Sequence, residues 1–224
     1  LKIEDIYQVG GAQAIAALAY GTKTIEKVNK IVGPGNIFVA NAKKQVFGDV
    51  GIDMVAGPSE VLIIADNTAN SEIIAADLLA QAEHDVNASS ILLTTSKMLA
   101  QKVLSDVKKL TKESPRSNII SESLKNNGKI FLMNSVKSCI DFSNSFAPEH
   151  LELLVNSPDK LLSKITNAGS IFLGKNSAEA FGDYIAGPSH VLPTGGSASF
   201  SSPLSSLDFI KYSSVTKISD IGLR

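Results

Sequence analysis

Short runs of aliphatic and β-branched residues alternate with longer segments of helical character along most of this chain. The runs are four to six residues long. Such alternation is typical of βαβ units, in which a helix follows each strand and crosses back over a mostly parallel sheet. It restricts the fold more strongly than any other feature of the sequence. The predicted strands are Lys30–Gly33, Val61–Asp66, Ile91–Ser96, Lys129–Asn134, Leu151–Val155 and Ser170–Gly174.

We therefore expect an α/β fold, with incomplete Rossmann-like three-layer α/β domains and mostly parallel sheets. Helical periodicity and Gly or Ser ends predict the helices, which are Gly10–Gly21, Asn36–Gly48, Ser71–His84, Met98–Glu113, Val136–Phe146 and Asp159–Asn167. The turn AGPS, Ala56–Ser59, is the expected internal boundary between residues 1–58 and residues 59–224. From about Pro193 the chain is rich in Ser and Gly, and we expect a loop that a partner orders.

Composition disfavours several classes of protein. The chain has 224 residues, with 21 Lys or Arg, 22 Asp or Glu and a formal net charge of -1. These charges are mixed along the chain, so neither nucleic acid nor a membrane surface is an expected partner. No apolar run approaches the roughly 20 residues that span a bilayer, and no signal peptide is recognisable, so a cytoplasmic location is expected. The single cysteine, Cys139, excludes an internal disulfide and is expected to be buried.

Gly-Pro turns mark three places where a ligand could be held. AGPS occurs twice, at Ala56–Ser59 and at Ala186–Ser189. Each copy is either a plain turn or a loop that lines a substrate site at the end of a strand, where α/β sheets hold their ligands. GPGN, Gly33–Asn36, lies between a predicted strand and a predicted helix. Backbone N–H groups at such a helix start can hold a phosphate, although a simple turn is an equal alternative.

The helix end LAQAEHD combines an amide and an imidazole. Asp77, Gln81 and His84 follow i, i+4, i+7 spacing, so they share one face of the predicted helix. An amide oxygen and an imidazole nitrogen are both acceptable to a divalent metal, although glutamine is an uncommon zinc ligand. From the spacing alone, a polar helix end is the alternative.

The other two histidines also lie near carboxylates. Glu149 and His150 follow a proline that is expected to restrict Ala147 to an extended conformation. Both side chains reach one substrate only if they lie in the loop before the strand, where they suit proton abstraction near neutral pH. His190 lies seven residues after Asp183. Taken singly, each histidine fits a structural or surface role; together the three suggest a site.

These segments together resemble the histidinol dehydrogenases, NAD-dependent enzymes of the last steps of histidine biosynthesis. The resemblance rests on long stretches in a fixed order. They are YQVGGAQAIAALAYGT, KIVGPGNIFVANAKKQVFG, IDMVAGPSEVLIIAD, ADLLAQAEHD, FAPEHLEL, and AGSIFLG through GDYIAGPSHVLPT. They cover nearly the whole chain and are more specific than any one short motif.

The resemblance implies the oxidation of L-histidinol to L-histidine through an aldehyde, in two NAD-linked steps, with one zinc ion (Zn2+) per subunit holding the substrate. Glu149 and His150 would be the catalytic proton acceptors, with Glu149 activating water. Residues 1–58 would belong to the NAD side, and residues 59–224 would carry the zinc and catalytic residues. The remaining implied contacts are zinc ligands Gln81, His84 and Asp183, NAD contacts Gln13 and Asn36, and substrate contacts Ser59, Gln81, His84, His150, Asp183 and His190.

The resemblance also implies that the chain is a fragment. Members of the family are considerably longer, with part of the NAD surface before this region. After it they have a fourth zinc ligand, a histidine, and a substrate-binding glutamate. In the family that histidine comes from the other subunit of a homodimer. Two other functions stay open: a metal-dependent hydrolase in which Glu149 activates water, and a metal-binding or dimerisation module without turnover.

Overall fold

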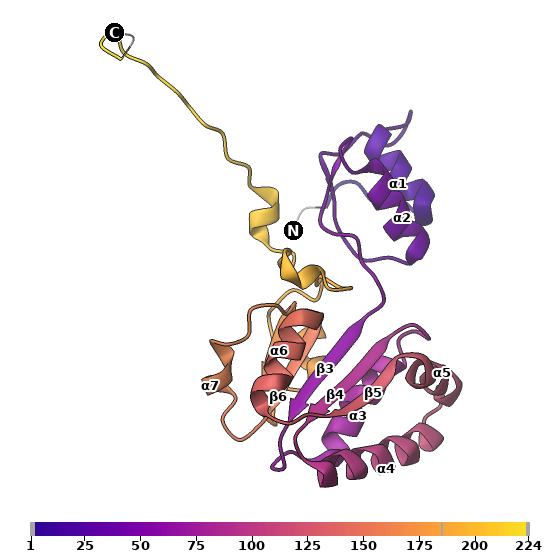
Figure 1. Cartoon of the computed structure of the whole chain (residues 1–224). Coiled ribbons are helices and arrows are strands. Elements are labelled where there is room, and N and C mark those ends of the chain that lie inside the picture. Colours follow the sequence, from indigo (N-terminus) through magenta and orange to yellow (C-terminus); the bar gives the residue numbers. More distant parts are fainter. Residues whose placement is uncertain (1–2, 185, 223–224) are drawn as a thin grey trace.

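The main element of the fold is a five-stranded sheet in the order β5-β4-β3-β6-β7 (Figure 1). The computed structural model describes residues 3–184 and 186–222. Every pairing between named strands in these residues is parallel, which confirms the predicted α/β class. The five strands are β3 (Glu60–Ala65), β4 (Ser89–Thr94), β5 (Gly128–Leu132), β6 (His150–Leu154) and β7 (Ser170–Leu173).

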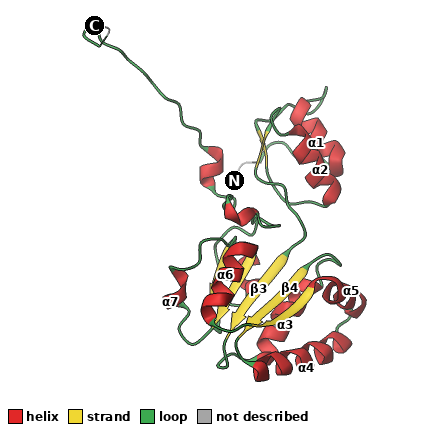
Figure 2. Cartoon of the chain, viewed as in Figure 1, coloured by secondary structure: helices red, strands yellow, loops and turns green. Residues whose placement is uncertain are grey.

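Helices cover both faces of this sheet and complete three layers (Figure 2). One face carries three helices, α3 (Ser71–Ala82), α4 (Lys97–Glu113) and α5 (Ser117–Asn127). The other face carries α6 (Val136–Phe146) and the short α7 (Asp159–Leu162).

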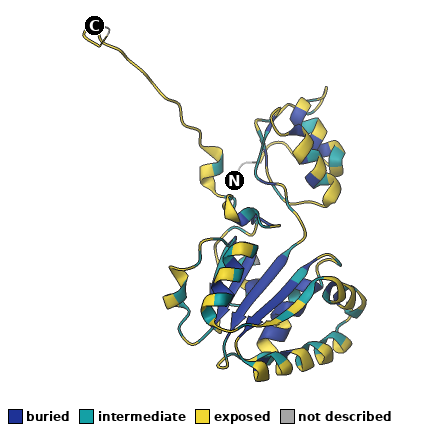
Figure 3. Ribbon diagram, in the orientation of Figure 1, coloured by how far each residue is buried: buried dark blue, intermediate teal, exposed yellow. Residues whose placement is uncertain are grey.

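The central strand β3 is buried along its whole length, because both of its faces are covered (Figure 3). Its side chains alternate between two cores. Val61 and Ile63 pack with α3 and α4, whereas Leu62 and Ile64 pack with α6. A strand covered on both faces has no polar face, which explains the unbroken apolar run VLII in the sequence.

The chain direction brings several distant segments to the amino edge of the sheet. From β3 the chain continues through α3 to β4 on one side, and it later returns through α6 to β6 on the other side of β3. Because α3 starts beyond the carboxyl end of β3 and runs back to the start of β4, its last turn lies at the amino edge. The loops that precede β3 and β6 lie at the same edge.

A smaller unit precedes the main sheet. It contains α1 (Gly11–Tyr20), α2 (Ile37–Val46) and a two-stranded parallel sheet of β1 (Lys30–Ile31) and β2 (Gly51–Ile52). Its core consists of Ile15, Ala19, Ile31, Val46 and Val50. The predicted division into residues 1–58 and 59–224 as separate domains stays a prediction.

One buried ion pair fixes the Gly-Pro-Gly turn of this smaller unit. Lys43 is 3% exposed, and its Nζ donates to the carbonyl of Gly33 at 2.9 Å and to the carboxylate of Asp53. The other oxygen of Asp53 accepts the backbone N–H of Gly33 at 2.8 Å. Both polar groups of the Gly33 backbone are therefore satisfied from within the unit.

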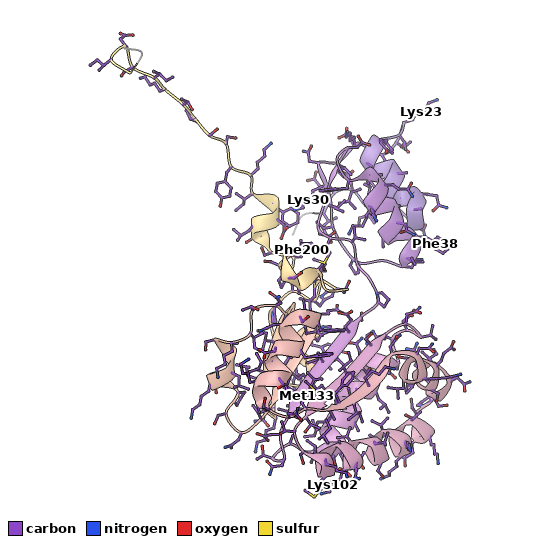
Figure 4. The ribbon with its side chains drawn as sticks, viewed as in Figure 1. Lys23, Lys30, Phe38, Lys102, Met133 and Phe200 are labelled. Atoms are coloured by element: carbon purple, nitrogen blue, oxygen red, sulfur yellow. The ribbon has the colours of Figure 1, made fainter. Side chains whose placement is uncertain are left out.

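After β7, the described residues contain only short 3-10 helices. These are η1 (Glu179–Asp183), η2 (Ser197–Ser199) and η3 (Ser206–Phe209). Beyond η3 the backbone runs away from the rest of the chain, and Tyr212 is 90% exposed (Figure 1). Figure 4 shows Lys30 beside this segment, where its Nζ lies 3.2 Å from Oδ1 of Asp208. That a partner orders the Ser/Gly-rich stretch stays a prediction.

Several element boundaries differ from those predicted. Helix α3 ends at Ala82 instead of His84, because Oδ1 of Asp85 accepts the N–H of Asn87 and forms an Asx turn. The segment predicted as a helix to Asn167 is helical only to Leu162. There, side-chain and backbone groups of Asn144 bind Thr166 and Asn167 and hold them in a loop. Helix α5 and strand β2 were not predicted. Strand β2 has only two residues, which is too short to produce a recognisable pattern.

None of the helices in the described part of the chain combines the length and the apolar character that crossing a bilayer demands.

Candidate active site

Glu149 and His150 lie side by side at the amino edge of the sheet. Glu149 is the last residue of the loop before β6, and His150 is the first residue of that strand. Strand β3 runs alongside, with Val61 opposite His150. The sequence predicted that both side chains would reach one substrate only if both residues lay in the loop before the strand. In the structure, Glu149 lies in that loop and His150 is the first residue of the strand. Glu149 and the first AGPS turn precede β6 and β3, so they lie at the amino ends of these strands, whereas α/β sheets usually hold their ligands at the carboxyl ends.

Glu149 is a buried carboxylate with a raised pKa. Its side chain is 8% exposed. The backbone N–H of Glu60 donates to Oε2 at 3.0 Å. Burial, together with the nearby carboxylates of Glu60 and Glu179, raises the pKa of Glu149 to about 8, although the Glu60 N–H and the Ser59 hydroxyl act to lower it. A carboxylate with a pKa near neutrality is a stronger base than an exposed one and suits the activation of water.

The ring of His150 has one nitrogen fixed by the backbone. Nδ1 lies 3.0 Å from the carbonyl oxygen of Glu60. Because a carbonyl can only accept a hydrogen bond, this contact assigns the proton of the neutral ring to Nδ1 and makes Nε2 the basic nitrogen. Nδ1 is also 3.7 Å from Oε2 of Glu149, and Nε2 is 3.5 Å from Oε1 of Glu179.

The loop before this pair has an unusual backbone. Ala147 has φ 52° and ψ 63°, which is the left-handed region, so the predicted extended conformation is wrong. Ala147 closes α6 as its C-cap and donates its N–H to the carbonyl of Ser143 at 2.8 Å. A left-handed residue at this position is a common way to end a helix. It turns the chain directly from α6 into the strand that carries His150.

The first AGPS turn and the segment that directly follows the second AGPS turn meet beside Glu149. They border a cavity of about 140 Å³. Ser59, predicted to contact the substrate, and His190, predicted to line the pocket, both lie on this cavity together with Glu149. The GPG turn of the smaller unit forms another part of the wall. Thr194, which follows the second copy, joins the two segments, because its hydroxyl accepts the N–H of Gly57 at 2.5 Å. The first AGPS copy thus lines this cavity in addition to forming a turn. From the second copy the chain runs directly into the lining residue His190.

Gln81 has the features of a side chain prepared for a ligand. It is 2% exposed, and its Oε1 has no hydrogen-bond partner among the described residues. An orphaned buried acceptor is costly unless a ligand satisfies it. Gln81 and Asp77 lie on one buried face of α3 as predicted, but His84 lies beyond the end of the helix and is exposed.

Asp183 is the last residue of η1. The 3-10 helix contacts α3, which carries Gln81. The side chain of Asp183 lies outside what the structure describes, so its role as a ligand stays a prediction. Within the described residues, no group of three or more His, Cys, Asp or Glu side chains forms a metal centre. The predicted zinc set, which includes a glutamine, differs in type from such a group.

Further buried carboxylates surround the site, and they were not singled out in the sequence. Glu152 is fully buried in β6 and contacts Asp77 on α3. Burial and the neighbouring charge raise the pKa of Glu152, and burial raises that of Asp77, so the pair holds a proton near neutral pH. Oε1 of Glu152 accepts the backbone N–H of Glu179 at 3.0 Å. A glutamate inside the apolar run LELLV is the one signal that could have indicated this cluster.

The two residues predicted to contact NAD lie on the smaller unit and are exposed. Gln13 is on α1. Asn36 is the N-cap of α2, where its Oδ1 accepts the N–H groups of Phe38 and Val39 at 3.1 Å each. Because the Asn36 carbonyl occupies these donors, the simple picture of a phosphate held by the first N–H groups of α2 does not hold here.

Comparison with known proteins identifies the relatives of this chain. The family model for histidinol dehydrogenase matches residues 1–224. Histidinol dehydrogenase from Clostridium acetobutylicum is 59% identical over 222 residues, which are 99% of this chain and 52% of that protein. The Bacillus licheniformis enzyme is 56% identical over 224 residues, which are 100% of this chain and 53% of that protein.

A solved structure agrees with the sequence relatives. The crystal structure of histidinol dehydrogenase from Elizabethkingia anophelis superposes with a TM-score of 0.91 at 48% identity, and it covers 93% of this chain and 48% of that one. The chain spans about half the length of the curated relatives it matches. This extent agrees with the expected fragment. From the family match and these relatives, we conclude that the chain belongs to the histidinol dehydrogenase family.

Proposed function

We propose that this chain supplies the acid-base half of an active site that oxidises L-histidinol to L-histidine through the aldehyde, with two molecules of NAD. The observation that carries the proposal is the pairing of Glu149 with His150 beside the cavity lined by the first AGPS turn and His190. Membership in the family supports the substrate class. A buried carboxylate and a buried imidazole of different basicity are suited to two different proton transfers.

The two bases divide the work by position. Nε2 of His150 takes the proton of the alcohol as the hydride leaves, since Nδ1 is already committed to the Glu60 carbonyl. Glu149, in its ionised form, takes a proton from water as that water adds to the aldehyde carbon. The hydrate then loses a hydride and a proton and becomes the carboxylic acid. NAD supplies the hydride acceptor in each oxidation when it is bound.

The buried face of α3 fits a cation. Gln81 offers an orphaned neutral oxygen, and we propose that it holds zinc together with His84 and Asp183. A fourth ligand would come from the partner subunit of a homodimer. Zinc would orient the imidazole and amine of the substrate. His84 is exposed and follows the end of α3, so its ring would have to turn toward Gln81 to complete this set.

The smaller unit is proposed to contact NAD through Gln13 and Asn36. The Asn36 carbonyl caps α2, which leaves its Nδ2 group as a donor for the cofactor. The Lys43 pair fixes the preceding GPG turn, and this turn also borders the cavity that contains Glu149. The cofactor and the two bases would therefore meet at one place.

The test is to supply the full-length protein that contains this sequence with zinc, L-histidinol and NAD and to follow the absorbance of NADH. We expect Glu149→Gln and His150→Asn each to abolish NADH formation, with zinc content unchanged. Glu113→Gln, an exposed carboxylate on α4, is the matched control and should retain the wild-type rate. NADH formation at an undiminished rate in Glu149→Gln would refute the assignment of the water-activating base.

The same samples separate the alternatives. A metal-dependent hydrolase would turn over an ester or amide without NAD, and its activity would still require Glu149. A metal-binding or dimerisation module would bind zinc and form no NADH. Zinc analysis of His84→Ala tests the ligand set directly, because an unchanged zinc content would remove His84 from it.

A further inference from the structure

Two glutamates face the ring of His150 from opposite sides. Glu149 faces Nδ1 at 3.7 Å, and Glu179 faces Nε2 at 3.5 Å. Glu149 is engaged by the Glu60 N–H and is the base proposed for water. Glu179 lies beside Nε2, the nitrogen that would receive the proton of the alcohol, and the proposed proton transfers do not involve it.

Glu179 is held rigidly in this place. Its side chain is 7% exposed, although it belongs to a short 3-10 helix on a connecting segment. Its backbone N–H donates to Oε1 of Glu152 at 3.0 Å, so the strand that carries His150 also anchors the start of η1. Phe172 on β7 packs near the imidazole, with ring centroids 6.1 Å apart. The arrangement fixes both members of the His150–Glu179 pair relative to one strand.

We propose that Glu179 is a positioning residue for His150: it holds the ring in the orientation in which Nε2 faces the substrate, and it stabilises the cationic ring after Nε2 has taken a proton. The proposal rests on the proposed function, because it concerns the base of that reaction. The separation of 3.5 Å exceeds the usual length of an N–H···O hydrogen bond, so the interaction in this state is electrostatic.

The physical reason is the burial of the ring. The His150 side chain is almost fully buried, so an imidazolium that forms there has little water to stabilise its charge. A fixed carboxylate close to the ring must therefore provide this stabilisation. The groups that face the ring are Glu149 from the loop, the Glu60 carbonyl from β3, Glu179 from η1 and the uncharged Phe172 from β7. Among these groups, Glu179 is the one that lies at Nε2.

The test is long-range 15N–1H NMR of the imidazole in the 224-residue chain. The chain has three histidines, so the signals of His84 and His190 are identified by replacing each with glutamine. We expect the neutral His150 ring to carry its proton on Nδ1. Glu179→Gln should lower the pKa of His150 by about one unit or more, the size expected when an opposite charge within about 4 Å is removed. Glu113→Gln should leave it unchanged.

Each result decides the proposal. An unchanged pKa of His150 in a folded Glu179→Gln protein, judged from its amide spectrum, overturns it. If that variant does not fold, Glu179→Asp replaces it: this variant keeps the charge and withdraws it by one methylene, so a smaller fall supports the proposal and no fall overturns it. A neutral ring protonated on Nε2 would also overturn it.

The NMR measurement needs neither NAD nor turnover, so it is independent of the dehydrogenase assay. A shifted His150 without NADH formation would retain the electrostatic role of Glu179 and reject the proposed reaction. NADH formation with an unshifted His150 would do the opposite. In an active preparation, Glu179→Gln should move the pH dependence of kcat toward lower pH while KM for L-histidinol changes little, and Glu179→Asp should restore part of the shift.

Discussion

Replacing Glu149 with glutamine should stabilise the protein while it removes the base. The folded-state pKa of Glu149 is raised from 4.5 to about 8, mainly by burial. Between these values the folded chain binds more protons than the unfolded chain, so its stability falls as pH rises. The stability that belongs to this group is fully present below about pH 4.5 and is lost progressively up to pH 8. Glutamine keeps the shape and the acceptor for the Glu60 N–H but does not titrate.

The magnitude follows from the size of the shift. One unit of pKa corresponds to about 1.4 kcal/mol, so at pH 7 the wild type is less stable than Glu149→Gln by about 3 kcal/mol. Urea unfolding at pH 5, 7 and 8 should show the difference growing by roughly 1.4 kcal/mol for each pH unit. Glu152 also titrates, but it contributes equally to both proteins and cancels.

The control and the refuting result are both simple. Glu113→Gln on exposed α4 should leave the pH dependence of stability as it is in the wild type. If Glu149→Gln and the wild type show parallel stability curves from pH 5 to pH 8, Glu149 is not a buried carboxyl with a raised pKa. Its assignment as a strong base for water would then lose its physical support.

Three further changes test other parts of the structure. Leu62→Ala, at 0% exposure in β3, should lower the free energy of unfolding in urea by about 2–5 kcal/mol. Leu104→Ala, at 46% exposure, should lower it far less, and equal losses in the two variants would contradict the core assignment. Lys43→Ala leaves a buried carboxylate unpaired and should cost about 3–5 kcal/mol, whereas exposed Lys44→Ala should be nearly neutral. Gln81→Leu should stabilise the metal-free chain by roughly 1–2 kcal/mol, since it removes an orphaned buried acceptor, and should weaken zinc binding in a calorimeter; a destabilised variant with unchanged zinc affinity would contradict both.

The main sheet could be predicted from sequence because every one of its strands is an apolar run between turns. The central strand is the clearest case, since burial on both faces demands an unbroken aliphatic run. Strand β2 has two residues and depends on its pairing with β1 instead of on its own pattern. The end of α3 depends on the side chain of Asp85, whose local hydrogen bonds compete with one more helical turn.

The catalytic pair could be predicted, but its surroundings could not. Glu149 and His150 are adjacent in the sequence, and the long motifs around them are specific. Glu179 reaches His150 only because the chain turns back after β7, and no periodic pattern encodes that return. Glu152 was not predicted as part of the site, because a polar residue in a strand is expected to face solvent. In the structure it is fully buried against Asp77.

The concentration of acids at the amino edge explains why one edge can serve several functions. Asp77, Glu149, Glu152 and Glu179 are all buried there, and so many negative charges close together away from water would be too costly to keep ionised. Burial therefore raises the pKa of several members and lets the group hold protons near neutral pH. The same arrangement favours any cation that enters, whether an imidazolium ring, a cationic substrate or a metal beside Gln81. The acid-base chemistry proposed for Glu149 and His150 is thus a consequence of packing carboxylates between β3, β6 and α3.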